Sequence, residues 1–201
     1  MKNVTIEVVH DGNIEQCRKL CNELMAFQKS KAIICSEKFN SMNFDTRMKK
    51  SYENALESQV IVAKDQDIPI GYVFSTVDHV RMEDKAAYPD WAPQGKSSIG
   101  FYPDWVKLPQ KIGCLNNLYL RDQYRQLGLG SKLFEMSMKW LESFADVNLI
   151  FVYISNGNDA ALNFYLKHGF TFSHDVFGGF IKAAYKKSCH VADDFMCLND
   201  K

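Results

Sequence analysis

Residues 121–144, RDQYRQLGLGSKLFEMSMKWLESF, decide the fold of this chain. The stretch begins polar and basic, passes through Gly128 and Gly130, and continues with the apolar spacing of an amphipathic helix. The preceding residues 112–120, IGCLNNLYL, are typical of a strand. A junction of strand, glycine turn and helix can hold phosphate. The helix N-terminus offers unpaired N–H groups with partial positive charge, and glycine lets the backbone approach closely.

Two common phosphate-binding motifs do not match this turn. A Walker A motif needs Gly-Lys-Ser/Thr, but Ser131 stands between Gly130 and Lys132. A dinucleotide fingerprint needs Gly or Ala where this chain has Leu133. At this point the glycines could serve a ligand or could serve packing alone.

A third pattern, Arg/Gln-x-x-Gly-x-Gly/Ala, is met by Arg125 to Gly130. A second motif, Asn-x-x-Ala-x-x-x-Tyr-x-x-x-Gly-Phe, follows one strand and one helix later, at Asn158, Ala161, Tyr165, Gly169 and Phe170. Together they resemble the two motifs of the GNAT acetyltransferase superfamily. The resemblance is close over residues 112–176, and elsewhere only the order of elements matches.

The rest of the chain supplies the elements that such a fold needs. Periodicity predicts strands at 4–10, 58–65, 68–80, 112–120, 148–155, 170–176 and 179–187, and helices at 14–27, 45–56 (capped by Asp45), 131–145 and 158–169. The resemblance implies an α/β (α+β) fold with a mixed, mostly antiparallel sheet of about seven strands and helices on both faces. We expect one acyltransferase domain at 1–187, with an insertion at 81–111, and a C-terminal tail at 188–201.

The resemblance also implies an activity: direct transfer of the acetyl group of acetyl-CoA to an amine. It assigns the diphosphate to the backbone N–H groups of Gln126, Leu127, Gly128, Leu129, Gly130 and Ser131, with Arg125 adding charge. It assigns the pantetheine arm to Leu118, Leu120 and Asn158. The Leu120 N–H would polarise the thioester oxygen, and Tyr165 would be the general acid. The alternative for Tyr165 is a core tyrosine whose hydroxyl is satisfied.

The general base is less well defined. Some relatives carry a glutamate on the strand before the turn, where this chain has Asn116 and Asn117. Neither amide accepts a proton near neutral pH. The candidates at the end of the preceding strand are Asp78, His79, Glu83 and Asp84, and deprotonation of the amine by water before binding needs no base.

The insertion offers a candidate acceptor site. Acidic and aromatic side chains attract protonated amines, and the insertion contains Glu83, Asp84, Trp91 and Trp105, together with Tyr88, Asp90, Tyr102 and Asp104. We expect a small cationic amine as acceptor. The alternatives are a satellite core of aromatics, a protein lysine or N-terminus as acceptor, and a non-catalytic acyl-CoA-binding sensor.

The composition limits the partners. Basic and acidic residues balance at 24 each, so neither nucleic acid nor a membrane is an expected partner. The chain begins without a signal-like segment, which favours a cytoplasmic protein with its six cysteines, at 17, 21, 35, 114, 189 and 197, as free thiols and no metal. A homodimer is possible if the last strand is exposed.

Overall fold

One mixed sheet organises the molecule. The structure, a computed structural model, describes residues 4–89, 91–93 and 99–189. Seven strands lie in the order β1-β2-β3-β4-β5-β7-β6, and only β4 and β5 are parallel neighbours. The strands are β1 (Val4–Val8), β2 (Glu57–Asp65), β3 (Ile68–Val80), β4 (Gln110–Leu120), β5 (Val147–Ser155), β6 (Thr171–Val176) and β7 (Ile181–Lys187). The predicted fold class is confirmed.

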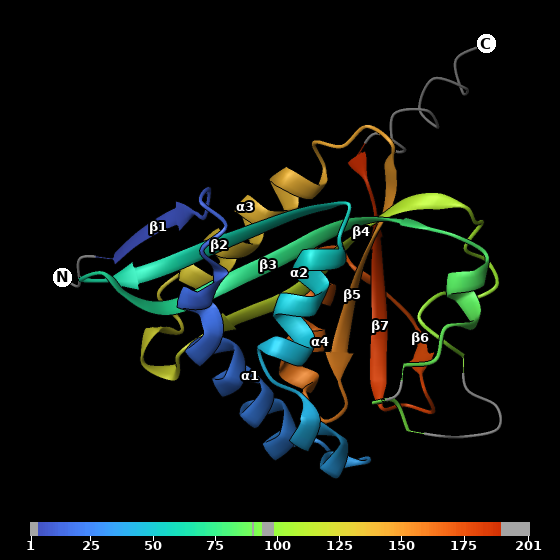
Figure 1. Ribbon diagram of the computed structural model, residues 1–201, viewed down its shortest axis with the longest axis horizontal. Coiled ribbons are helices and arrows are strands. Elements are labelled where there is room, and N and C mark those ends of the chain that lie inside the picture. Colours follow the sequence, from blue (N-terminus) through green and yellow to red (C-terminus); the bar gives the residue numbers. More distant parts are fainter. Residues whose placement is uncertain (1–3, 90, 94–98, 190–201) are drawn as a thin grey trace.

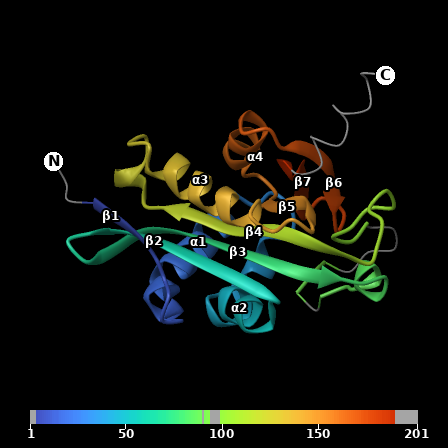
Figure 2. The ribbon, with the colours of Figure 1, turned by 90° about the horizontal axis from the view of Figure 1, so that it is seen from above.

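Helices cover both faces of the sheet (Figures 1 and 2). On one face lie α1 (Arg18–Lys31) and α2 (Lys50–Asn54), and on the other lie α3 (Leu129–Leu141) and α4 (Asp159–Lys167). Short helical turns complete the described chain: η1 (Ile14–Cys17), η2 (Ser36–Ser41), η3 (Asp45–Lys49), η4 (Glu83–Ala86) and η5 (Asp122–Tyr124).

The two helical layers bury separate cores. On the α3 side, Leu133, Phe134 and Met138 follow helical spacing and pack in one cluster with sheet residues. On the α1 side, Cys17 and Cys21 belong to the core. Both are free thiols, and burial raises the pKa of Cys17 to about 12, so it packs as a small apolar side chain. Cys197 lies outside the described residues.

Strands β4 and β5 separate partway along their length. Their pairing runs from Lys111 opposite Val147 to Leu115 opposite Val152 and then ends. At that point β4 contains a bulge, because Ser75 of β3 faces Leu115 while Phe74 faces Asn117, which leaves Asn116 without a partner in the ladder. A bulge bends its strand. Residues 117–120 therefore stay paired with β3 while leaving β5, and a gap opens in the middle of the sheet.

One prediction from the sequence was wrong, and the condition named for a homodimer is not met. Asp45 does not cap the second helical segment. Asn43 accepts a hydrogen bond from the Thr46 N–H at 3.0 Å, and Asp45 pairs with Arg18 at 2.6 Å. The last strand is not an exposed edge either, because β7 lies between β5 and β6.

The segment between β3 and β4 packs against the half of the sheet that carries β5, β6 and β7. Tyr153 on β5 donates its hydroxyl to the Phe101 carbonyl at 3.0 Å, and His174 Nε2 lies 2.9 Å from the Gly100 carbonyl. The Phe177 N–H donates to the Ile99 carbonyl at 3.0 Å. These contacts hold the described part of the insertion over one end of the sheet. Within the described residues, no helix combines the length and apolar character needed to cross a bilayer.

Candidate functional site

The glycine turn before α3 is open rather than packed. Gln126 and Gly128 have φ of 62° and 76°, and α3 begins directly afterwards. A Cβ built on Gly128 or Gly130 would meet no protein atom within 4 Å. Packing therefore does not explain why glycine stands at these positions.

The first turn of α3 presents unused donors to this open space. The Lys132 N–H is bonded to the Gly128 carbonyl at 3.0 Å, as in the first full turn of a helix. The preceding N–H groups of Leu129, Gly130 and Ser131 have no intrahelical acceptor. They lie at the positive end of the helix dipole, so the turn can bind an anion. Leu127 beside them is 61% exposed.

Arg125 joins the turn to the end of β4. Its Nε donates to the Leu120 carbonyl at 2.9 Å, and its Nη2 pairs with Asp122 at 2.9 Å. The guanidinium also lies over the rings of Phe27, at 5.3 Å, and Tyr119, at 6.0 Å. The resemblance implied that Arg125 adds positive charge for the diphosphate. In the structure its side chain also holds the end of β4 in place.

The separated part of β4 presents backbone groups to the gap. Leu118 faces Val73 and Leu120 faces Gly71 across the ladder with β3, and the Arg121 N–H donates to the Ile70 carbonyl. Backbone groups of an antiparallel strand alternate in direction. Those of Leu118 and Leu120 therefore point away from β3, toward the gap that β5 leaves.

The second motif places its two polar residues on α4. Asn158 caps that helix by accepting from the Ala161 N–H at 3.4 Å. Tyr165 is buried in the core on the α3 side, where its ring contacts Phe134 and Phe170. Burial raises the pKa of the Tyr165 phenol above its ordinary value of 10.0, so the group stays protonated at neutral pH.

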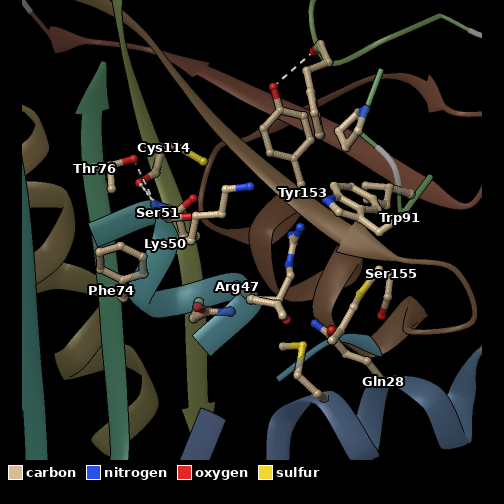
Figure 3. A pocket seen from close by; sticks show the side chains of 18 of the residues that line it. Gln28, Arg47, Lys50, Ser51, Phe74, Thr76, Trp91, Cys114, Tyr153 and Ser155 are labelled. Atoms are coloured by element: carbon tan, nitrogen blue, oxygen red, sulfur yellow. Dashed lines mark hydrogen bonds between the residues drawn. The ribbon is translucent and has the colours of Figure 1, made fainter. Parts of the chain in front are cut away.

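A cavity of about 450 Å³ lies on the opposite face, beneath α1, α2 and the insertion. Figure 3 shows side chains from all three regions pointing into it. Its floor includes both arms of the gap: Asn116 and Asn117 from β4, and Tyr153 and Ser155 from β5. The cavity therefore reaches the place where the sheet opens toward the face that carries α3.

One acid lines this cavity, among the residues that the structure describes. Asp78 at the end of β3 accepts from the Leu56 N–H at 3.3 Å and from the Thr76 hydroxyl. Thr76 in turn accepts from the Asn116 amide at 2.9 Å. Burial outweighs these hydrogen bonds and raises the pKa of Asp78 above its ordinary value of 3.8. His79, one residue on, is exposed and does not line the cavity.

Only one of the four predicted acceptor residues lines the cavity. Trp91 does, and it also packs against Phe177. Glu83 pairs with Arg81 at 3.6 Å, and Asp84 accepts from the Arg81 N–H at 2.8 Å, both outside the lining. Trp105 instead packs on Tyr185, with ring centroids 4.7 Å apart. Asp90 lies outside the described residues.

The cavity has two cationic lining residues that the sequence did not suggest, Arg47 and Lys50. They come from η3 and α2, in a segment whose charges have the pattern of a solvated helix face. No local signal distinguishes them from surface residues. Within the described part of the chain, no cluster of three or more His, Cys, Asp or Glu could hold a metal ion.

Comparisons with known proteins agree with this geometry. The model of the family described as "Acetyltransferase (GNAT) family" matches residues 26–170. A Drosophila melanogaster protein named "Probable N-acetyltransferase san" is 36% identical over 59 residues, which are 29% of this chain and 29% of that protein. The chain thus matches less than a third of that relative's length.

Two solved structures share the fold. The PaiA N-acetyltransferase from Thermoplasma acidophilum, in complex with coenzyme A, has a TM-score of 0.58 at 16% identity, over 91% of this chain and 99% of that chain. Arabidopsis thaliana Naa50, in complex with the bisubstrate analogue CoA-Ac-MVNAL, has a TM-score of 0.54 at 15% identity, over 91% and 97%. At these identities the likeness shows the fold alone.

Proposed function

The chain belongs to the acetyltransferase (GNAT) family, whose model covers most of its length, and we propose that it moves an acetyl group from acetyl-CoA to the primary amine of a small molecule. The observation that carries this proposal is the cavity that opens onto both arms of the gap between β4 and β5. An acyl group held in the gap from the α3 side would meet an acceptor held in the cavity.

The residues around the gap fit acetyl-CoA. The free N–H groups at Leu129, Gly130 and Ser131 suit a diphosphate, and the open space at the two glycines lets it come close. The backbone groups of Leu118 and Leu120 suit the amides of the pantetheine arm, which would pair with β4 as a further strand does.

Three groups of this chain would serve the transfer. Bound acetyl-CoA supplies an activated thioester. In our proposal the Leu120 N–H is aimed at the carbonyl oxygen, where negative charge develops during attack. Asp78 lies several residues along the sheet from Leu120, so it takes a proton from the acceptor's ammonium group through water in the cavity, and the resulting neutral amine attacks the thioester. The raised pKa of Asp78 brings its basicity closer to that of the amine. Tyr165 gives a proton to the leaving thiolate, because its phenol is protonated at neutral pH, although burial, by raising its pKa, makes it a weaker acid.

The size and enclosure of the cavity support a small acceptor. The described part of the insertion and α2 both contribute lining residues, among them Trp91 and Asn54. A volume of about 450 Å³ lies within the usual range of small-molecule sites. The protonated amine would arrive at Asp78 rather than at Glu83 and Asp84, which the sequence-based hypothesis named and which lie outside the cavity lining. We also propose a cytoplasmic location.

An amine screen with acetyl-CoA tests this proposal. Purified protein is mixed with acetyl-CoA and with small primary amines, peptides or protein substrates in turn, and release of the CoA thiol is followed. We expect release with small amines. Release with peptides or proteins alone would identify a macromolecular acceptor. Tight acetyl-CoA binding without thiol release on any acceptor would identify a non-catalytic sensor.

A further inference from the structure

Arg47 differs from every other arginine of this chain. Each of the others pairs with a carboxylate: Arg18 with Asp45, Arg81 with Glu83, Arg121 with Glu23 and Arg125 with Asp122. Among the described residues, no carboxylate lies within ion-pair distance of Arg47. Its guanidinium instead lies over the Trp91 ring, at 4.5 Å from the centroid.

The guanidinium of Arg47 points into the cavity (Figure 3). The residue as a whole is only partly buried, but loss of hydration at its charged end lowers the pKa of Arg47 below the ordinary 12.5. A shielded charge is costly unless it is paired. The Trp91 ring compensates part of this cost and leaves the planar fork of N–H donors unused.

Two further residues that line the cavity also suit a ligand with anionic oxygens. Lys50 follows Arg47 by three residues, and Figure 3 shows its side chain directed into the cavity. Ser155 is 5% exposed, and its hydroxyl is buried without a hydrogen-bond partner among the described residues. Cationic donors and an unsatisfied hydroxyl in one cavity favour a ligand with anionic oxygens.

An acidic side chain lies in the part of the same cavity that β3 and β4 form. Asp78 lies there with Thr76 and Asn116, beside the residues that border the gap. An acceptor that filled the cavity would thus meet an acid near the gap and cations elsewhere in the lining.

We propose that the acceptor carries an anionic group, a carboxylate or phosphate, which Arg47 binds while its amine faces Asp78 and the gap. This inference rests on the acetyltransferase function proposed above and narrows its substrate class to zwitterionic amines. The guanidinium would bind the anion through paired N–H donors, and Lys50 would add a second positive charge.

Matched acceptor pairs test the inference. Straight-chain ω-amino carboxylates and aminoalkyl phosphates are compared with the alkylamines of equal chain length, by thiol release from acetyl-CoA. For the unaltered protein we expect kcat/KM to be about tenfold to a hundredfold higher for the better anionic series than for the alkylamines, which is the range for hydrogen bonds to charged groups. The two anionic series distinguish a carboxylate from a phosphate.

Variants assign the preference to Arg47. Arg47→Met keeps an apolar stem over Trp91 and should abolish the preference, mainly through KM for the anionic acceptor, whereas Arg47→Lys should keep part of it. Acetyl-CoA affinity by calorimetry should be unchanged in both. Arg81→Met, which removes an exposed cation outside the cavity, is the matched control and should keep the full preference.

The possible failures are distinguishable. If alkylamines react as well as their anionic partners, the acetyltransferase function stands and the inference fails. If Arg47→Met lowers the melting temperature without changing the preference, Arg47 is structural and the inference also fails. If acetyl-CoA binds but no amine releases thiol, the proposed function fails and the inference fails with it.

Discussion

The Nε of Arg125 donates to the carbonyl of Leu120 at 2.9 Å and so joins the glycine turn to the end of β4. This bond links the part of the site that would hold the diphosphate to the part that would hold the thioester. The same guanidinium pairs with Asp122. Arg125 therefore has a positioning role in addition to its charge.

Replacing Arg125 separates these roles. Arg125→Lys keeps the positive charge but loses the fork that bonds Leu120 and Asp122 together, so we expect acetyl-CoA affinity to fall by about tenfold, the value of roughly one hydrogen bond to a charged group. Calorimetry measures the change. Asp122→Asn, which leaves the Leu120 bond intact, should bind acetyl-CoA almost normally. Equal loss in both variants would show that the ion pair matters and the Leu120 bond does not.

Tyr165→Phe should lower kcat by about a hundredfold and leave acetyl-CoA affinity nearly unchanged, because a general acid acts on the leaving group and not on binding. Stopped-time thiol assays and calorimetry on the same preparation provide both values. Tyr185→Phe removes a phenol that packs against Trp105 away from the cavity and is the control. Unchanged turnover in Tyr165→Phe would remove this residue from the mechanism and leave it a core tyrosine.

If Asp78 is the general base, kcat/KM should depend on pH through its raised pKa. Burial raises the pKa of Asp78, so the carboxyl gains its proton at a higher pH than an ordinary aspartate would as the solution is acidified. A protonated Asp78 cannot accept a proton. Because Asp78 accepts a proton from the acceptor's ammonium group, kcat/KM should fall about tenfold per pH unit below the pKa of Asp78 and stay level above it until the free amine loses its own proton.

In the variant Asp78→Asn this acidic limb should be replaced by a rise that continues to the pKa of the amine, and kcat/KM at neutral pH should fall by about a hundredfold. The exposed Glu83→Gln should keep the full profile. A profile in Asp78→Asn that superposes on that of the unaltered protein would exclude Asp78 as the base, and would favour an amine that loses its proton to water.

Asn156 should contribute strongly to stability. It is 3% exposed, accepts from the N–H groups of Ile33 and Ile34, and donates to the carbonyls of Ile34 and Phe180. Asn156→Ala would remove hydrogen bonds to two segments, at residues 33–34 and at residue 180, so we expect urea unfolding to show a loss of about 2 to 4 kcal/mol. The exposed Asn148→Ala on the same strand should change stability by less than about 0.5 kcal/mol. Similar losses in the two variants would contradict this account.

Local pattern predicted most of the fold. Alternation and helical spacing are properties of short segments, so β3, β5 and α3 could be located from the sequence to within a few residues. The glycine turn could be predicted equally well. Gly128 has a positive φ, which favours glycine, and the helix that follows has its own apolar spacing, so both can be recognised in a short segment of sequence.

The residues that line the cavity could not be predicted from the sequence in the same way. Arg47 and Lys50 reach it because η3 and α2 cross the sheet at one orientation, and nothing in residues 45–54 encodes that direction. The bulge at Asn116 depends on cross-strand register, which a single strand does not specify. Asp45 was misjudged because Arg18, distant in sequence, competes for its carboxylate.

Calorimetric titration of acetyl-CoA into the unaltered protein and into Gly130→Leu tests the central claim most directly. A Cβ at position 130 would meet no protein atom within 4 Å, so we expect Gly130→Leu to fold with a nearly unchanged melting temperature. It would nevertheless fill the space in which the diphosphate contacts the turn. We predict clear binding by the unaltered protein and at least about a hundredfold weaker binding by the variant, the cost of losing charge-assisted hydrogen bonds. Equal affinity in the two proteins, or no uptake of acetyl-CoA by either, would contradict the account.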